Sequence, residues 1–346
     1  MNKLILMILL ILQLAIPVSA MEFSPPPVPD SGADVMPSDT ASFADGLWDL
    51  LKKAILRIRP DLKEAVNAGI CVISACIIVS LLDSTASDAS TLVTLTGTLC
   101  VSTILVMGAN TMIRLGAQTV TEISEYGRLL LPVMTAALAA QGGMTSSATL
   151  YTGTALFDMI MTSILSGLLV PLVYLYLALS VSNSAVGEDL LKRLRDLVKG
   201  FVSWTLKTIL TVFTTYISIT GVVSGTTDAA ALKATKVTLS SVVPVVGGIL
   251  SDASEAVLVS AAVMKNAAGI YGILAILAIF MEPFLKIWIH YMVLKATGAL
   301  CSLFGTKRLT SLVEDFGSAM GLLLAMTGAV CLMMLISTVC FMKGFG

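Results

Sequence analysis

Residues 319–342 read AMGLLLAMTGAVCLMMLISTVCFM, and this stretch decides the fold class because none of its 24 side chains is charged. A helix needs about 20 mainly apolar residues to cross the hydrocarbon core of a bilayer. Similar runs recur along the chain, some interrupted by glycine pairs that favour re-entrant half-helices. We expect about ten of them, at 67–82, 91–110, 129–148, 150–170, 171–186, 201–224, 237–260, 262–282, 283–304 and 319–342.

The composition agrees with a membrane protein. Of the 346 residues, 56% are hydrophobic and 12% are charged, and the mean hydropathy is +0.94. A soluble domain carries roughly 25% charged residues, so this chain has about half the charge that a water-facing surface needs. The formal net charge of -1 and the absence of a basic stripe exclude nucleic acid as an expected partner. The sequence predicts an all-α, polytopic transmembrane helical bundle.

The N-terminus has the pattern of a secretory signal peptide over residues 1–20. Lys3 supplies the positive charge, an apolar core follows, and Val18-Ser19-Ala20 resembles a cleavage site. An uncleaved first anchor is the alternative, and both place the following segment outside the cytoplasm. Residues 21–45 contain five prolines and few large apolar residues, which predicts a disordered linker.

Residues 46–66 predict an external amphipathic helix. Leu47, Leu50, Leu51, Ile55, Ile58 and Leu62 recur at spacings of three and four, with lysines and arginines between them. Such a helix lies on a membrane surface or against a partner.

The remaining prolines indicate an internal duplication. Pro132 and Pro244 are 112 residues apart, and so are Pro171 and Pro283. The box that starts at Lys192-Arg193-Leu194 is echoed 115 residues later by Lys307-Arg308-Leu309. We therefore predict a repeat of about 110–115 residues. The expected membrane units are 67–200 (first repeat), 201–316 (second repeat) and 317–346 (final transmembrane helix).

The two Lys-Arg pairs predict how the repeats are oriented. Short cytoplasmic loops are enriched in lysine and arginine, so both pairs are expected on the cytoplasmic side. An even number of spans between them makes the copies parallel rather than inverted.

Charged residues inside apolar runs are the candidate functional residues, because a charge within a bilayer costs several kcal/mol. Glu282, Lys286 and His290 share one helix face at spacings of four, which suits a channel lining, a proton relay or a simple interfacial anchor. Asp158 suits a water-filled path or polar helix contact, or a structural hydrogen bond with a threonine or serine on a neighbouring helix. The candidates are Asp158, Glu282, Lys286 and His290, then Lys207 and Lys265, which suit interfacial anchors, partners of helix C-termini or substrate ligands, and Asp228 in an external turn between two runs.

The chemistry of an enzyme is missing from the sequence. His290 is the single histidine, so histidine-based metal sites lack ligands. The six cysteines lie in apolar runs without metal spacing and are expected to be reduced packing residues. No nucleophile elbow or phosphate loop is found. We expect no catalytic residue, no cofactor and no metal.

Several segments resemble the stage III sporulation protein AE family of endospore-forming bacteria. They are Lys207-Thr208, residues 221–228, Lys233 with Lys236, Pro244–Gly247 with Ser251-Asp252, and residues 265–269. The resemblance implies a multi-pass protein of the mother-cell membrane around the forespore. It also implies a channel or secretion-like complex with the other stage III A-operon proteins and stage II sporulation protein Q.

Two functions are therefore weighed. The first is a non-enzymatic component of that transenvelope channel complex. The alternative is an autonomous secondary transporter with a substrate site at the repeat interface, which requires Asp158 or the row from Glu282 to His290 at the membrane midplane. An intramembrane enzyme would require a close pair of catalytic groups.

Overall fold

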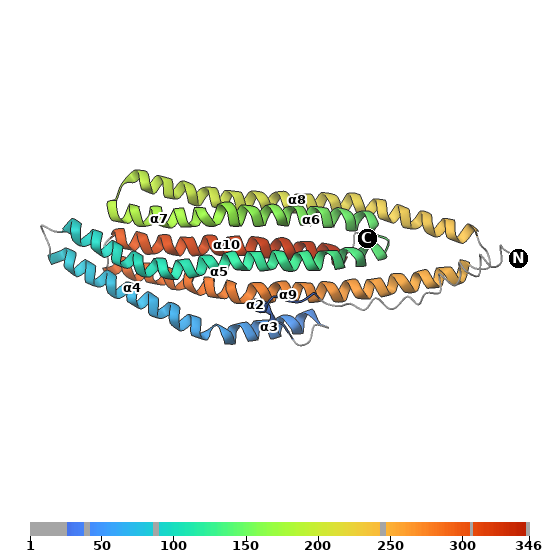
Figure 1. Cartoon of the computed structure of the whole chain (residues 1–346), viewed down its shortest axis with the longest axis horizontal. Coiled ribbons are helices and arrows are strands. Elements are labelled where there is room, and N and C mark those ends of the chain that lie inside the picture. The colour runs from blue at the N-terminus through green and yellow to red at the C-terminus, as the bar shows by residue number, and fades with distance from the viewer. Residues whose placement is uncertain (1–25, 38–41, 86–89, 243–246, 305–306, 344–346) are drawn as a thin grey trace.

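The computed structural model describes residues 26–37, 42–85, 90–242, 247–304 and 307–343; the side chains of residues 90, 91, 220–262 and 264 lie outside that description. Figure 1 shows long helices that run nearly parallel to one axis. The predicted signal peptide falls outside the described residues. The elements are α2 (Asp30–Ala33), α3 (Phe43–Arg57), α4 (Arg59–Thr85), α5 (Ser90–Ala140), α6 (Met144–Ile164), η1 (Leu165–Leu169), α7 (Val170–Val186), α8 (Asp189–Val242), α9 (Gly247–Phe304) and α10 (Lys307–Lys343).

The described residues confirm the all-α class. Some apolar runs that we predicted as separate helices belong to one continuous helix. Five helices are long and apolar enough to cross a bilayer, namely 59–85, 92–140, 144–186, 265–304 and 307–343. Pro132 and Pro283 each lie inside one continuous helix, so the expected runs 262–282 and 283–304 are joined at Pro283 in α9. Packed neighbours allow a helix in a membrane to continue through proline. The expectation of about ten separate spans is therefore wrong for the described part of the chain.

Proline and glycine act differently at two other positions. The one-turn π-helix η1 precedes Pro171 and connects α6 to α7, so residues 144–186 form one long rod with a local irregularity. Gly142 has a φ of 90°, a left-handed conformation that suits glycine, in the turn between α5 and α6. The Gly142-Gly143 pair thus marks a turn between two helices.

The long helices alternate in direction. The last residues of α4, α7 and α9 and the first residues of α5, α8 and α10 all lie at one end of the bundle, on the left of Figure 1. Arg308 at the start of α10 donates a 3.4 Å hydrogen bond to the carbonyl of Ala185 near the end of α7. The two Lys-Arg pairs, which lie near the starts of α8 and α10, therefore share one end, as a common cytoplasmic side requires.

The internal repeat stays a prediction. Helices α5 and α8 run in the same direction, but alternate helices of any up-and-down bundle do so without a duplication. Pro171 lies near the start of α7 and Pro283 lies inside α9. Pro132 lies inside α5, whereas Pro244 falls outside the described residues.

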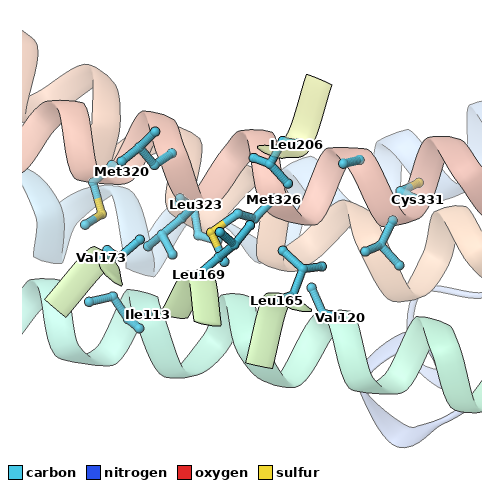
Figure 2. Packing of buried hydrophobic residues seen from close by; sticks show 14 of the residues in the cluster. Ile113, Val120, Leu165, Leu169, Val173, Leu206, Met320, Leu323, Met326 and Cys331 are labelled. Atoms are coloured by element: carbon cyan, nitrogen blue, oxygen red, sulfur yellow. The ribbon is translucent and has the colours of Figure 1, made fainter. Parts of the chain in front are cut away.

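Helix α10 lies at the centre of the bundle. Twenty of its 37 residues are buried, against five of 27 in α4. Figure 2 shows Met320, Leu323 and Met326 of α10 among side chains of α5, η1, α7 and α8. The helix that carries the uncharged run 319–342 thus packs against most of the others, while α4 presents most of its surface outward.

The predicted linker is ordered over its described part. Residues 26–37 contain α2, and Val35 is fully buried against Leu50, Ala54 and Ala278. A Cβ on Gly32 would lie 2.9 Å from the backbone nitrogen of Ile279, so only glycine allows α2 to approach α9 this closely. The linker was expected to be disordered because it cannot form a core alone; it is ordered here because α9 supplies the apolar surface.

The predicted amphipathic helix is divided in two. Helix α3 ends at Arg57 and α4 begins at Arg59, with Ile58 buried between them. The apolar side of α3 packs against α9 through Leu50 and Ala54. Within the described residues, the surface that covers this face is therefore α9.

The central position of α10 makes a matched pair of substitutions informative. Leu323→Ala, at a buried site, is expected to lower the free energy of unfolding by about 3 kcal/mol because it leaves a cavity. Leu332→Ala changes the same residue type in the same helix at a site that is 52% exposed, and should have little effect. Unfolding of both variants in mixed micelles titrated with denaturing detergent measures the difference. Equal losses would contradict the central position of α10.

Candidate functional site

Asp158 lies in α6 with its side chain buried against α5. Ser124 of α5 donates a 2.6 Å hydrogen bond to Asp158 Oδ2, and Thr162 donates a 3.1 Å bond to the Ser124 hydroxyl. Asp158 Oδ1 is buried and has no hydrogen-bond partner among the described residues. The arrangement is the structural hydrogen bond that the sequence offered as one of two interpretations, with one acceptor left over.

The predicted pair of Glu282 and Lys286 forms in α9. Their side chains are 3.0 Å apart. Each also contacts the segment from α2 to the first turn of α4, which we call the N-terminal segment. Arg57 Nε lies 3.3 Å from Glu282 Oε2, and Lys286 Nζ lies 3.7 Å from Asp61 Oδ1. Arg57 is in turn 2.8 Å from Asp34. We call these five residues the α9 charge ladder.

The charge ladder connects three separate elements to α9. Asp34 follows α2, Arg57 ends α3, and Asp61 lies in the first turn of α4. The hydrogen bond to Asp34 and the charge of Glu282 raise the pKa of Arg57 further above its ordinary value, so its positive charge persists at every physiological pH. The ladder therefore anchors the N-terminal segment on the side of the bundle.

His290 does not form a relay of side chains with Glu282 and Lys286. Its Nδ1 lies 3.0 Å from the backbone carbonyl of Lys286, one turn earlier in the same helix. The imidazole thus bonds to its own helix.

The other predicted residues are dispersed. Lys207 is exposed on α8. Lys265 is buried in α9, with no salt bridge in the part of the chain that the structure describes. Asp228 belongs to α8, but its side chain lies outside the described residues. Asp158 faces α5 while Glu282 and Lys286 face the N-terminal segment, so the structure does not bring the predicted residues into one site.

A buried ion pair that the sequence analysis missed joins α8 to α10. Arg195 Nη1 lies 2.5 Å from Asp315 Oδ2, and Tyr176 of α7 donates a 3.3 Å hydrogen bond to Asp315 Oδ1. Arg195 also bonds to Asp196, which is exposed. Arg195 and Asp315 are each over 90% buried. The three helices are thereby fixed together near the end that carries the Lys-Arg pairs.

A signal for this pair was present in the sequence. Arg195 precedes Val198, Val202 and Leu206 on one buried stripe of α8, at spacings of three and four. A charge on an apolar stripe indicates a buried partner. Which helix supplies that partner depends on tertiary packing.

The arrangement supports structure more directly than catalysis. Among the described residues there is no group of three or more histidine, cysteine or acidic side chains that could hold a metal ion. All six cysteines are free thiols, and Cys76, Cys301 and Cys331 are buried. Two sets of charges, the Arg195–Asp315 pair and the charge ladder, form ion pairs between helices, and such pairing lowers the desolvation cost of charged residues in membrane proteins.

Long charge-poor helices with paired internal charges define a multi-pass helical membrane protein. The sequence profile of stage III sporulation protein AE matches residues 41–344. The chain belongs to the stage III sporulation protein AE family, and it is a sporulation membrane protein. Stage III sporulation protein AE of Bacillus subtilis (strain 168) is 23% identical over 266 residues, which are 76% of this chain and 66% of that relative. No solved structure matches the chain.

The buried pair of Arg195 and Asp315 predicts that a single substitution lowers the stability much more than the double substitution does. Arg195→Met alone leaves the Asp315 carboxylate buried without its cation and should cost about 3–5 kcal/mol of stability. Combining Arg195→Met with Asp315→Leu should restore most of that loss, because neither buried group is then charged. Denaturing-detergent titrations of the two variants measure the effect. A double variant as unstable as the single one would contradict a role confined to charge pairing.

The charge ladder predicts how firmly the N-terminal segment is held. Glu282→Gln removes the charge that Arg57 and Lys286 share, so limited proteolysis within residues 42–58 should become a few-fold faster, matching a loss of about 1 kcal/mol. Lys52→Gln is the control, since Lys52 is exposed on α3 and has no salt bridge among the described residues. Unchanged cleavage in Glu282→Gln would show that apolar packing alone holds the segment.

Proposed function

We propose that this protein is a non-enzymatic, multi-pass component of a channel or secretion-like complex between mother cell and forespore. It resides in the mother-cell membrane around the forespore and is needed for forespore development. Its partners are the other stage III sporulation A-operon proteins and stage II sporulation protein Q. The name of the family supports the sporulation role, and the shape of the α8–α9 hairpin supports assembly with partners.

The length of α8 and α9 carries the proposal. At 1.5 Å per residue, their 54 and 58 residues span about 80 and 87 Å. A bilayer with its headgroups is only about 40–45 Å thick, and a tilt of 40° still leaves a helix of 80 Å roughly 15 Å too long. Part of this hairpin therefore extends outside the bilayer.

The extension coincides with the segment of family resemblance. In Figure 1, α8 and α9 continue past the turn between α5 and α6 and past the end of α10. Residues 221–242 of α8 and 247–269 of α9 lie in or near this extension. A helical hairpin beyond the protein's own bundle is suited to contact other proteins, and most of the segments that carry the family resemblance lie in or near it.

The placement of the charged residues favours a scaffold over an autonomous transporter. A transporter needs its intramembrane charges around one substrate site, commonly at a repeat interface. Asp158 bonds to Ser124, while Glu282 and Lys286 bond to Arg57 and Asp61. The transporter remains the second candidate because the unpartnered Oδ1 of Asp158 is the kind of group that a proton or cation pathway uses.

A deletion strain complemented with two alleles separates the candidates. The scaffold function predicts that deletion blocks development after engulfment and that the Asp158→Asn allele restores spore formation to within about twofold of the wild-type allele. Asparagine keeps an acceptor for the Ser124 hydroxyl but removes the charge. Heat-resistant spore counts and co-purification of the partners from sporulating cells measure the outcome.

The transporter function predicts different results in the same strains. Deletion would leave spore formation normal and cause a nutrient defect. The Asp158→Asn allele would fail to correct that defect, and proteoliposomes containing the wild-type protein alone would transport solute. Those observations would overturn the scaffold proposal.

A further inference from the structure

We propose that a pocket between α8, α9 and α10 binds the phosphate headgroup of an anionic phospholipid. The pocket has a volume of about 250 Å³ and is open on one side. Its lining residues are Lys199, Tyr291, Lys295, Ser318, Gly321 and Leu322. This site is independent of the proposed channel function, because it concerns the lipid around the protein.

Two lysines from different helices supply the positive charge of the pocket. Lys199 of α8 donates a 3.2 Å hydrogen bond to the Ser318 hydroxyl of α10. Lys295 of α9 has its ammonium group 5.9 Å from the centre of the Tyr291 ring. Ammonium groups and a hydroxyl are the donors that hold phosphate oxygens in proteins. Neighbouring Leu322 and Gly321 leave an apolar wall beside these donors, which suits the start of an acyl chain.

The acidic residues nearby do not neutralise these lysines through salt bridges. Asp196 and Asp315 both pair with Arg195. Glu314 is exposed and lies against Gly298, one turn beyond Lys295 on α9. Neither lysine has a salt bridge within the described ranges of the chain. Both ammonium groups therefore have donor capacity left for an anion.

The pocket lies where the helices change from charged to uncharged sequence. Helix α10 carries Lys307, Arg308, Glu314 and Asp315 in its first nine residues and then no charge up to Met342. On α8, charges are dense from Asp189 to Lys199, and a 62% exposed Trp204 follows about 7.5 Å further along the helix. Exposed tryptophan is typical of the level of lipid headgroups. A headgroup at this level can reach both lysines.

The side of the membrane also favours an anionic lipid. The Lys-Arg pairs share this end of the bundle, and the positive-inside bias assigns it to the cytoplasmic leaflet. Bacterial and other cytoplasmic leaflets carry anionic lipids, and basic pockets between membrane helices on this side bind their headgroups. Free phosphate offers the same oxygens but lacks acyl chains to use the apolar wall.

Lipid titration of the purified full-length protein tests the site. Native mass spectrometry would count phosphatidylglycerol bound to the wild type and to the double variant Lys199→Gln/Lys295→Gln. Each charge-assisted hydrogen bond from a pocket lysine to the headgroup should contribute about fivefold in affinity, so the double variant should bind phosphatidylglycerol about 10- to 30-fold more weakly. Phosphatidylcholine with the same acyl chains should bind both proteins equally weakly.

A matched control removes the same charge elsewhere at this end. Lys192→Gln/Lys307→Gln alters two exposed lysines outside the pocket and should keep phosphatidylglycerol affinity within about twofold. An equal loss in this control, or no loss in the pocket variant, would overturn the proposal. Displacement of the lipid by millimolar inorganic phosphate would identify soluble phosphate as the ligand and would also overturn it.

Discussion

The constraint on which this structure depends is that backbone amides in lipid have no water to bond with. Each N–H and C=O group must find its partner within the chain, and a continuous helix provides this along its whole length. That is why Pro132 and Pro283 lie inside helices instead of ending them. Once the helices exist, lipid gives little hydrophobic force to associate them, so close packing and polar contacts must do so. The central helix α10, with its small and flexible side chains packed against α5, η1, α7 and α8, fulfils the first need.

Charged residues fulfil the second need, in two separate places. The pair of Arg195 and Asp315 fixes α8 to α10 near one end of the bundle. The charge ladder fixes the N-terminal segment to the side of α9 through Glu282 and Lys286. In both places a charge that would be costly to bury alone is paired with an opposite charge from another helix. Because an unpaired buried charge is destabilising, these pairs specify which helices pack together. Lys265 and the free oxygen of Asp158 are the exceptions in the described chain.

These packing and charge contacts describe a helical membrane protein of the stage III sporulation protein AE family. Two sets of charges, the Arg195–Asp315 pair and the charge ladder, hold helices together, and the α8–α9 hairpin is too long to be contained in a bilayer. Both features agree with the scaffold function that we propose. The basic pocket at the Lys-Arg end adds a contact with the membrane itself, since Lys199 and Lys295 have no acidic partner among the described residues.

The sequence by itself determined the solvent, the helical class and the family, because each depends on local composition or on short motifs. The run 319–342 is long and apolar enough to span a bilayer wherever it lies in the fold, and the spacing of Glu282 and Lys286 makes them neighbours on any helix. Tertiary structure alone decided what depends on contacts between distant segments. It ordered residues 26–37 by covering Val35 with α9, brought Asp315 to Arg195 across 120 residues, and separated Asp158 from the charges of α9. Helical periodicity indicates that Arg195 lies on the buried face of its helix. Only the tertiary packing specifies that α10 supplies its partner.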